Sequence, residues 1–158
     1  MNTFPKSMQI YREQLQQGAL QEAYRGLMAY MSELRAHFQK ACPEYAAPGA
    51  IYPGTMDMTY FAIVPEFLKP RRLKIAVVFL HQEFRFEVWL SGANRQVQAE
   101  YWKRLEGRHW APYRRVADPL KADAILEFTL VEDPDFSDPQ GLTAQIERGT
   151  LQFIDAME

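Results

Sequence analysis

The sequence predicts an α+β fold, in which a largely antiparallel sheet of about four strands is covered by helices. Residues 19–41 carry apolar side chains at alternating steps of four and three, which is the spacing of one helix face. Residues 73–80 and 84–90 alternate in the manner of strands. The chain has 158 residues, of which 47% are hydrophobic, so residues 1–158 are expected to form a single domain with its own core.

Two helices are predicted at the start of the chain. The first covers residues 7–17, with Ser7 as its cap and Gly18 at its end. The second covers residues 19–41 and is stopped by Pro43. Its apolar stripe is continuous, so we expect it to pack along its full length. The stripe consists of Leu20, Tyr24, Leu27, Met31, Leu34, Phe38 and Ala41.

A loop and three strands are expected next. Prolines and glycines crowd residues 43–54, which indicates a loop, and Ile51 and Tyr52 within it indicate that the loop folds back onto the domain. The strands cover residues 56–64, 73–80 and 84–90. Only a few residues separate the last two strands, so they are predicted to form a hairpin.

The register of this hairpin follows from its alternation, because one face must be apolar throughout. The predicted register pairs Leu80 with Arg85 and Val78 with Glu87. The core face then carries Leu73, Ile75, Val77, Phe79, Phe84, Phe86, Val88 and Leu90. The opposite face, which we call the mixed face, carries Lys74, Ala76, Val78, Leu80, Arg85, Glu87 and Trp89.

A helix, a strand and a helix complete the predicted order. The helix covers about residues 95–106, with Asn94 as its cap and Gly107 at its end. Residues 108–123 are expected to be irregular, and residues 124–131 form a strand. Asp138 and Pro139 are expected to begin the last helix. Its predicted buried stripe is Leu142, Ile146, Gly149, Phe153 and Ala156.

Composition narrows the class of protein. The single cysteine, Cys42, cannot form an internal disulfide, which favours a reducing, cytoplasmic location. The first residues lack the apolar stretch of a signal peptide, and the longest apolar run, residues 75–80, is too short to cross a membrane. The histidines His37, His81 and His109 are far apart, so neither a metal nor another cofactor is predicted.

Charge is unevenly distributed along the chain. The net charge is −2, yet residues 69–115 hold eleven Lys or Arg against four Asp or Glu, and residues 116–158 hold two against ten. Basic and aromatic residues interleave within residues 95–115, which suits stacked bases or phosphates. Alternatively, the acidic final helix neutralises this segment and its aromatic side chains are core and rim.

Several stretches resemble an uncharacterised family of small bacterial cytosolic proteins. They are IYPGTMDMTYF at residues 51–61, LKIAVVF at residues 73–79, RFEVWLSGAN at residues 85–94, and the aromatic pair Tyr101 and Trp102. The resemblance covers about residues 10–130. It implies family membership and no particular activity.

The core order helix, three strands, helix, strand also resembles the PD-(D/E)xK nuclease fold. Active members hold a metal with an acid on one strand and an acid-x-lysine on the next. Here Glu87 is followed two residues later by Trp89, so tryptophan stands at the lysine's position. Lys74 lies opposite Ser91, four residues from Glu87, or about 13 Å away. The resemblance therefore implies at most a degenerate relative without cleavage chemistry. A degenerate, metal-dependent phosphodiesterase that uses Asp57 and Glu87 is kept as an alternative hypothesis.

No reaction follows from these residues, because no nucleophile, base and metal constellation is present. The leading hypothesis is a non-enzymatic module that binds a ligand or a protein through the mixed face of the 73–90 hairpin, the expected partner being an anionic small molecule or a protein. The degenerate phosphodiesterase and nucleic-acid binding through residues 95–115 are the alternatives. The candidate binding residues are Tyr52, Asp57, Lys74, Arg85, Glu87 and Trp89.

Overall fold

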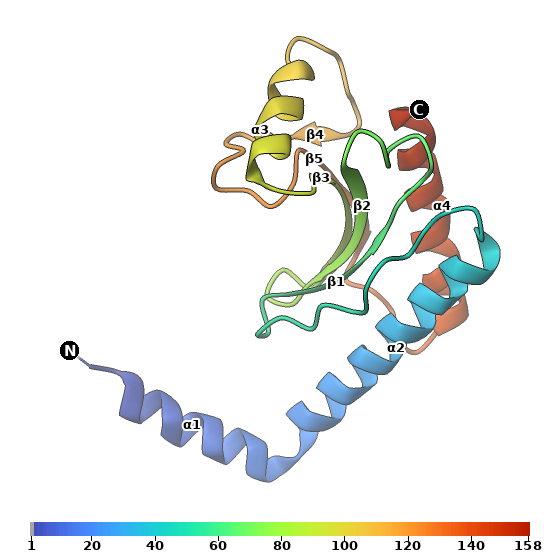
Figure 1. Cartoon of the computed structure of the whole chain (residues 1–158). Coiled ribbons are helices and arrows are strands. Elements are labelled where there is room, and N and C mark those ends of the chain that lie inside the picture. Colours follow the sequence, from blue (N-terminus) through green and yellow to red (C-terminus); the bar gives the residue numbers. More distant parts are fainter. Residues whose placement is uncertain (1) are drawn as a thin grey trace.

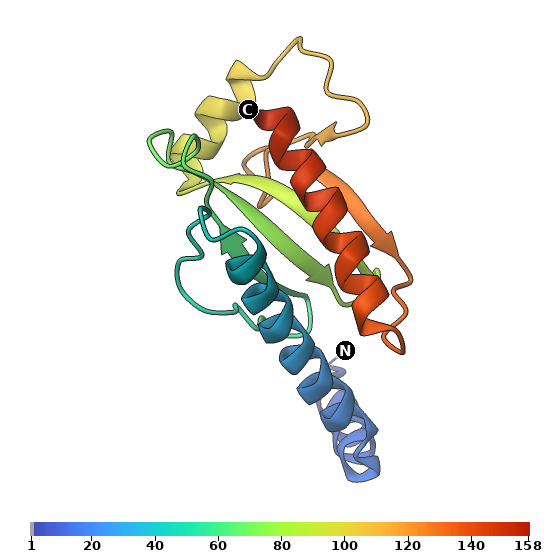
Figure 2. The ribbon, with the colours of Figure 1, turned by 90° about the vertical axis from the view of Figure 1, so that its right-hand side faces the viewer.

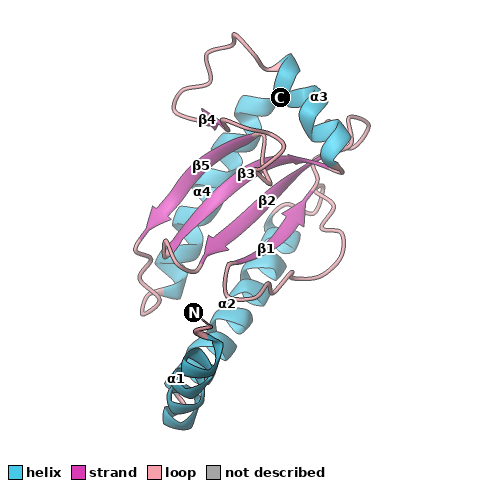
Figure 3. Cartoon of the chain, turned by 90° about the vertical axis from the view of Figure 1, so that its left-hand side faces the viewer, coloured by secondary structure: helices cyan, strands magenta, loops and turns pink. Residues whose placement is uncertain are grey.

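The structure is a computed structural model that describes residues 2–158, and it confirms the α+β class (Figure 1). Its helices are α1 (Phe4–Gln17), α2 (Ala19–Ala41), α3 (Arg95–Arg104) and α4 (Pro139–Met157). Its strands are β1 (Met58–Ile63), β2 (Leu73–Leu80), β3 (Arg85–Gly92), β4 (Arg114–Arg115) and β5 (Leu126–Glu132). The described strands pair antiparallel in the order β1-β2-β3-β5-β4 (Figure 3).

The helices are distributed unevenly around the sheet. Helices α2 and α4 lie side by side over one face (Figure 2), while α3 packs where β3 ends. Helix α1 projects away from the rest of the molecule (Figure 1), and none of its side chains is buried. None of the described helices is both long and apolar enough to cross a membrane.

The predicted hairpin is confirmed with its register. Leu80 pairs with Arg85 and Val78 pairs with Glu87. The core face packs against α2 and α4 and is buried at every predicted position except Phe84. Phe84 is 45% exposed because it belongs to the turn, where its φ of 54° takes it out of the strand alternation.

The predicted packing of α2 along its full length is wrong. Met31, Leu34 and Phe38 are buried, whereas Leu20 is 44% exposed and Ala41 is also exposed. The helix is 23 residues long and only its C-terminal half lies over the sheet. The N-terminal half therefore presents its apolar stripe beyond the core.

Most helix and strand boundaries lie within a few residues of those predicted from the sequence. α1 begins at Phe4 instead of Ser7, with Pro5 in its first turn. Asn94 and Asp138 cap α3 and α4 as predicted, accepting from the backbone N–H groups of Val97 and Gly141. In α4, Leu142, Ile146 and Phe153 are buried as predicted, but Ala156 is exposed. The two-residue strand β4 was not predicted, because it lies in the proline-containing basic segment.

Candidate functional site

An apolar groove of about 710 Å³ lies between the N-terminal half of α2 and the end of the sheet where β2 turns into β3. One wall is the uncovered part of the α2 stripe, and the other is built from aromatic and aliphatic side chains around the turn. The α2 wall includes Leu20, Tyr24, Leu27 and Tyr30, and the facing wall includes Met56, Phe79, Phe84 and Phe136. Pockets of this size and character are the usual sites of ligand and partner binding.

The walls of the apolar groove expose large hydrophobic side chains that folding leaves uncovered. Leu20, Met56, Phe84 and Phe136 are all more than one third exposed. Single exposed apolar residues are ordinary, but a contiguous set marks an interaction surface. The groove is therefore the strongest candidate site in the described part of the chain.

Aromatic rings in tilted and edge-to-face contacts form the wall around the β2–β3 turn. The ring of Phe79 lies 5.5 Å from that of Phe84, 5.0 Å from that of Phe86 and 5.9 Å from that of Phe136, centroid to centroid. Tyr30 of α2 closes the cluster with an edge contact to Phe136 at 5.8 Å. Such interlocked rings hold the wall in one shape.

The polar groups of the groove are mostly occupied by neighbours. The Tyr30 hydroxyl is 3.0 Å from Thr143 Oγ1, and burial raises the pKa of Tyr30. The Thr59 hydroxyl donates to the Pro53 carbonyl, so His81 Nε2 must donate to Thr59 Oγ1 at 2.7 Å. Burial lowers the pKa of His81, partly opposed by the Asp57 carboxylate. The groove thus offers apolar surface and few free polar groups.

A second uncovered apolar surface lies on α1. Its side chains at Phe4, Met8, Tyr11 and Leu15 follow steps of four, three and four, so they share one face of the helix, which we call the α1 face. The surface around Met8, Tyr11 and Leu15 also includes Arg12. The α1 face is not part of the groove within its own chain.

Three of the residues predicted to bind a ligand meet on the mixed face. Glu87 is only 2% exposed, and its two carboxylate oxygens accept from Arg85 Nε–H at 2.6 Å and from Trp89 Nε1–H at 2.9 Å. Trp89 is buried as well, in a small second cluster with Val78 and Val116. The acid is therefore held by its own strand neighbours.

Tyr52 and Lys74 each lie beside Tyr60 of β1. The loop carrying Tyr52 folds back as predicted, through reciprocal backbone hydrogen bonds with Tyr60. The rings of Tyr52 and Tyr60 are 5.0 Å apart, and Lys74 Nζ lies 5.7 Å from the Tyr60 ring centre. Tyr52 is exposed, whereas Tyr60 and Lys74 are half-buried, so solvent reaches this aromatic pair and its adjacent ammonium group.

Asp57 is engaged by the backbone of its own loop. Its carboxylate accepts from the Thr55 backbone N–H at 2.9 Å, and backbone hydrogen bonds from Thr55 and Met58 lower its pKa. Asp57 and Glu87, the two acids of the phosphodiesterase hypothesis, are thus engaged by different neighbours. Within residues 2–158, no three His, Cys, Asp or Glu side chains cluster in a way suited to a metal ion.

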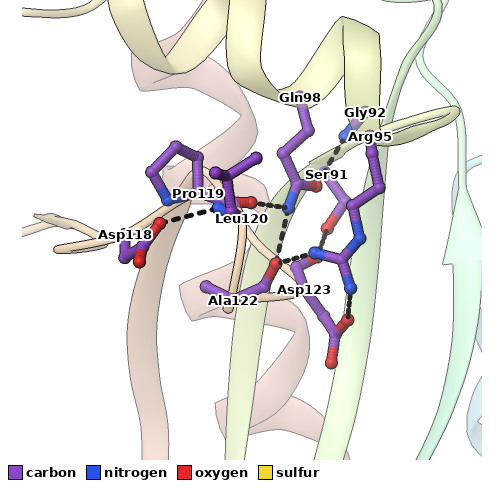
Figure 4. A network of polar contacts seen from close by, with 9 residues as sticks. All are labelled: Ser91, Gly92, Arg95, Gln98, Asp118, Pro119, Leu120, Ala122 and Asp123. Carbon is purple, nitrogen blue, oxygen red and sulfur yellow. Dashed lines mark hydrogen bonds and ion pairs between the residues drawn. The ribbon is translucent and has the colours of Figure 1, made fainter.

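A polar network ties α3 to the end of the sheet and to the segment before β5 (Figure 4). Gln98 Nε2–H donates to the Ala122 carbonyl at 2.7 Å, and Arg95 pairs with Asp123 at 3.0 Å. The Ser91 hydroxyl donates to the Asp123 carbonyl at 2.8 Å. The network fixes this segment, whose Val116, Ala122 and Ala124 pack on the mixed face.

The basic aromatic segment, residues 95–115, uses many of its charges internally. Arg104 pairs with Glu100, Arg114 pairs with Glu127, and the Arg115 guanidinium lies 3.8 Å above the ring centre of Trp102. The aromatic side chains are core and rim, as the alternative reading expected. However, the carboxylate partners lie on α3, on β5 and at Asp123, rather than on the final helix.

The sequence does not predict the groove, because the exposure of a side chain depends on the tertiary structure. The α2 stripe was recognised, but its periodicity does not reveal where the sheet beneath it ends. The spacing of Phe4, Met8, Tyr11 and Leu15 was a usable signal, because it marks a second amphipathic helix. Phe84 and Phe136 carried no signal, since one lies in a turn and the other in a loop.

Comparison with known proteins gives a family and no activity. A family model described as a domain of unknown function, DUF7000, matches residues 4–158. Neither the curated proteins nor the solved structures gave a match. This agrees with the resemblance of the sequence to an uncharacterised family.

Proposed function

The chain belongs to the DUF7000 family, a domain of unknown function, and we propose that it is a non-enzymatic interaction module whose apolar groove binds the apolar face of an amphipathic helix. One observation carries the proposal. The α2 stripe that packs on the sheet through Met31 and Leu34 continues through Leu20, Tyr24 and Leu27 into the groove, where these side chains are only partly covered. A stripe that continues beyond the core is suited to a partner that completes it.

A helix fits this groove better than a polar metabolite does. Small-molecule sites orient their ligands with a few precisely placed polar groups, whereas the hydroxyl of Tyr30 and the imidazole of His81 are already bonded to Thr143 and Thr59. An apolar groove flanked by a long helix suits the helix-in-groove mode, in which side chains at i, i+3, i+4 and i+7 are the anchors.

The test is fluorescence anisotropy with a labelled model peptide that has leucine at positions i, i+4, i+7 and i+11 and lysine or glutamine elsewhere. We expect saturable binding to the wild type and at least tenfold weaker binding to Leu20→Glu, whose side chain is 44% exposed, so that the fold should tolerate the change. Ser32→Glu adds the same charge to an exposed position on the other side of α2 and should bind as the wild type does. Equal binding by all three proteins would overturn the proposal, and so would the absence of binding to a wild type that is monomeric at the concentration used.

A second candidate is the solvent-accessible cluster beside β1, formed by the exposed Tyr52 and the half-buried Tyr60 and Lys74. An ammonium group over the Tyr60 ring, with the tilted Tyr52 ring beside it, suits a small anion that carries an aromatic ring. Thermal-shift measurements with a panel of nucleotides test this idea. A stabilisation that Lys74→Met abolishes would support it, and no shift with any nucleotide would remove it.

Nucleic-acid binding through residues 95–115 stays a prediction, for which affinity must fall steeply with salt. We further propose that the protein works in the bacterial cytoplasm. The support is the single cysteine, Cys42, which is free and buried, together with the sequence resemblance to small bacterial proteins.

A further inference from the structure

We propose that the helix bound in the apolar groove is α1 of a second copy of this chain, so that two copies exchange their α1 helices reciprocally. The inference rests on the proposed function and names its partner. In such a twofold dimer the α1 face, formed by Phe4, Met8, Tyr11 and Leu15, enters the groove of the other copy, and every contact occurs twice.

The first argument is that α1 lacks packing within its own chain. It has 14 residues, none of them buried, and Phe4 is 65% exposed. Isolated helices shorter than about 12–15 residues are marginal in water. A helix with a continuous apolar face and no buried side chain therefore needs a docking surface to persist.

The second argument is the match in length between the two surfaces. The 14 residues of α1 span about 21 Å at 1.5 Å per residue. The α2 wall of the groove runs from Leu20 to Glu33, which is the same number of residues and therefore the same length. The two apolar surfaces therefore have the same length. Docked in parallel, they leave Arg12 five positions from Glu33, or ~7.5 Å along the axis, which the two long side chains can span.

The third argument is charge. Arg12 is the one charged side chain among the described residues that surround Met8, Tyr11 and Leu15, and Glu33 is the one carboxylate among those that line the groove. None of the ion pairs within residues 2–158 uses Arg12 or Glu33. Docking of α1 in the groove brings a cation to a surface whose carboxylate forms no ion pair within the described residues.

The fourth argument favours a second copy over the chain's own α1. Only Gly18 separates α1 from α2, and antiparallel helix pairs are usually joined by 2–5 residues. With this single-residue link, α1 leaves α2 at an angle and extends away from the sheet (Figure 1). A second copy meets no such restriction.

The experiment is sedimentation equilibrium of the full chain over a wide concentration range. We expect a dimer for the wild type. Met8→Glu should raise the dimer dissociation constant at least a hundredfold, because the charge is introduced twice into an apolar contact. Ile10→Glu is the matched control: it lies on α1 with similar exposure but points away from the α1 face, so the dimer should persist.

A charge exchange tests the contact itself. Arg12→Glu and Glu33→Arg should each weaken the dimer about tenfold, since symmetry repeats a modest ion pair, and the double variant should restore it. A wild type that stays monomeric overturns the inference, as does a dimer that Met8→Glu leaves intact or that Ile10→Glu also dissociates. If the double variant does not regain wild-type dimer affinity, Arg12 and Glu33 are not in contact, which contradicts this docking.

The labelled model peptide separates this inference from the proposed function. Monomeric Met8→Glu has a free groove and should bind the peptide more tightly than the dimeric wild type does. If the wild type is monomeric and binds the peptide, the groove keeps its function and the second copy is excluded. If the wild type is monomeric and neither protein binds the peptide, both proposals are contradicted.

Discussion

Arg85 and Glu87 are joined on one strand by a hydrogen bond of 2.6 Å between Arg85 Nε and Glu87 Oε2, on the face of the sheet that the sequence leaves free for a ligand. Glu87 is 2% exposed, whereas the Arg85 side chain still reaches solvent. The pair is therefore a buried carboxylate held by a partly exposed cation. Removal of the cation should lower the stability of the fold.

Removal of Arg85 should destabilise the protein more than the sequence suggests. The sequence predicts little cost for Arg85→Ala if the mixed face is open to solvent. Because Glu87 is buried and would keep only the Trp89 N–H, we expect a loss of about 1–3 kcal/mol in the free energy of unfolding. Urea unfolding measures it. Arg104→Ala breaks an exposed pair on α3 and should cost about 0–1 kcal/mol; equal losses would contradict this reading.

Replacement of Phe79 should mainly lower stability, whereas replacement of Phe84 should mainly weaken binding. Phe79 is buried among three other phenylalanine rings, so Phe79→Ala should cost about 3–5 kcal/mol. Phe84 is exposed in the groove wall, so Phe84→Ala should cost about 1 kcal/mol or less while weakening binding of the model peptide. Unfolding and anisotropy measurements on both variants check this, and unchanged peptide binding by Phe84→Ala would argue against the groove.

His81 should make stability fall in weak acid. Burial lowers its pKa in the folded state, so the unfolded chain, in which histidine titrates near ~6.5, takes up the proton first. The stability that neutral His81 contributes is fully present above a pH of about 6.5. It is lost as the pH falls toward the lower pKa of His81 in the folded state. Free energies of unfolding should be measured between about pH 7.5 and pH 5. They should fall more steeply with decreasing pH for the wild type than for His81→Gln. Parallel profiles would show that His81 titrates normally.

Gly54 should be less replaceable than Gly107, although both have positive φ. A Cβ on Gly54 would lie 2.7 Å from Asp57 Oδ1 and closer still to the Met58 carbonyl, whereas one on Gly107 would meet nothing within 4 Å. Gly107→Ala should therefore cost only the left-handed conformation, about 1–2 kcal/mol, and Gly54→Ala clearly more. Equal thermal shifts for the two variants would mean that the loop before β1 relaxes easily.

The hairpin was predictable because its register is enforced by chemistry. A slip of one residue would place Lys74 and Glu87 in the core, so the alternation fixes both the pairing and the buried face. The caps Asn94 and Asp138 were predictable for a similar reason, since each satisfies a backbone N–H of its own helix.

The candidate site was less predictable, because it depends on where one element ends beneath another. The stripe from Leu20 to Phe38 is uniform in sequence, and only the position of the sheet decides that Met31 is buried while Leu20 is exposed. Likewise, the burial of Glu87 follows from its contacts with Arg85 and Trp89, which alternation alone does not reveal.

Hydrogen exchange of α1 tests the central claim, that the groove holds an α1 helix, most directly. At a concentration where the wild type is dimeric, amides of residues 4–17 and 20–30 should be protected together, and Met8→Glu should lose both while Ile10→Glu keeps both. Undocked, α1 is a short helix without buried side chains and should exchange rapidly. Rapid exchange of residues 4–17 in the wild type, unchanged by Met8→Glu, would contradict the account.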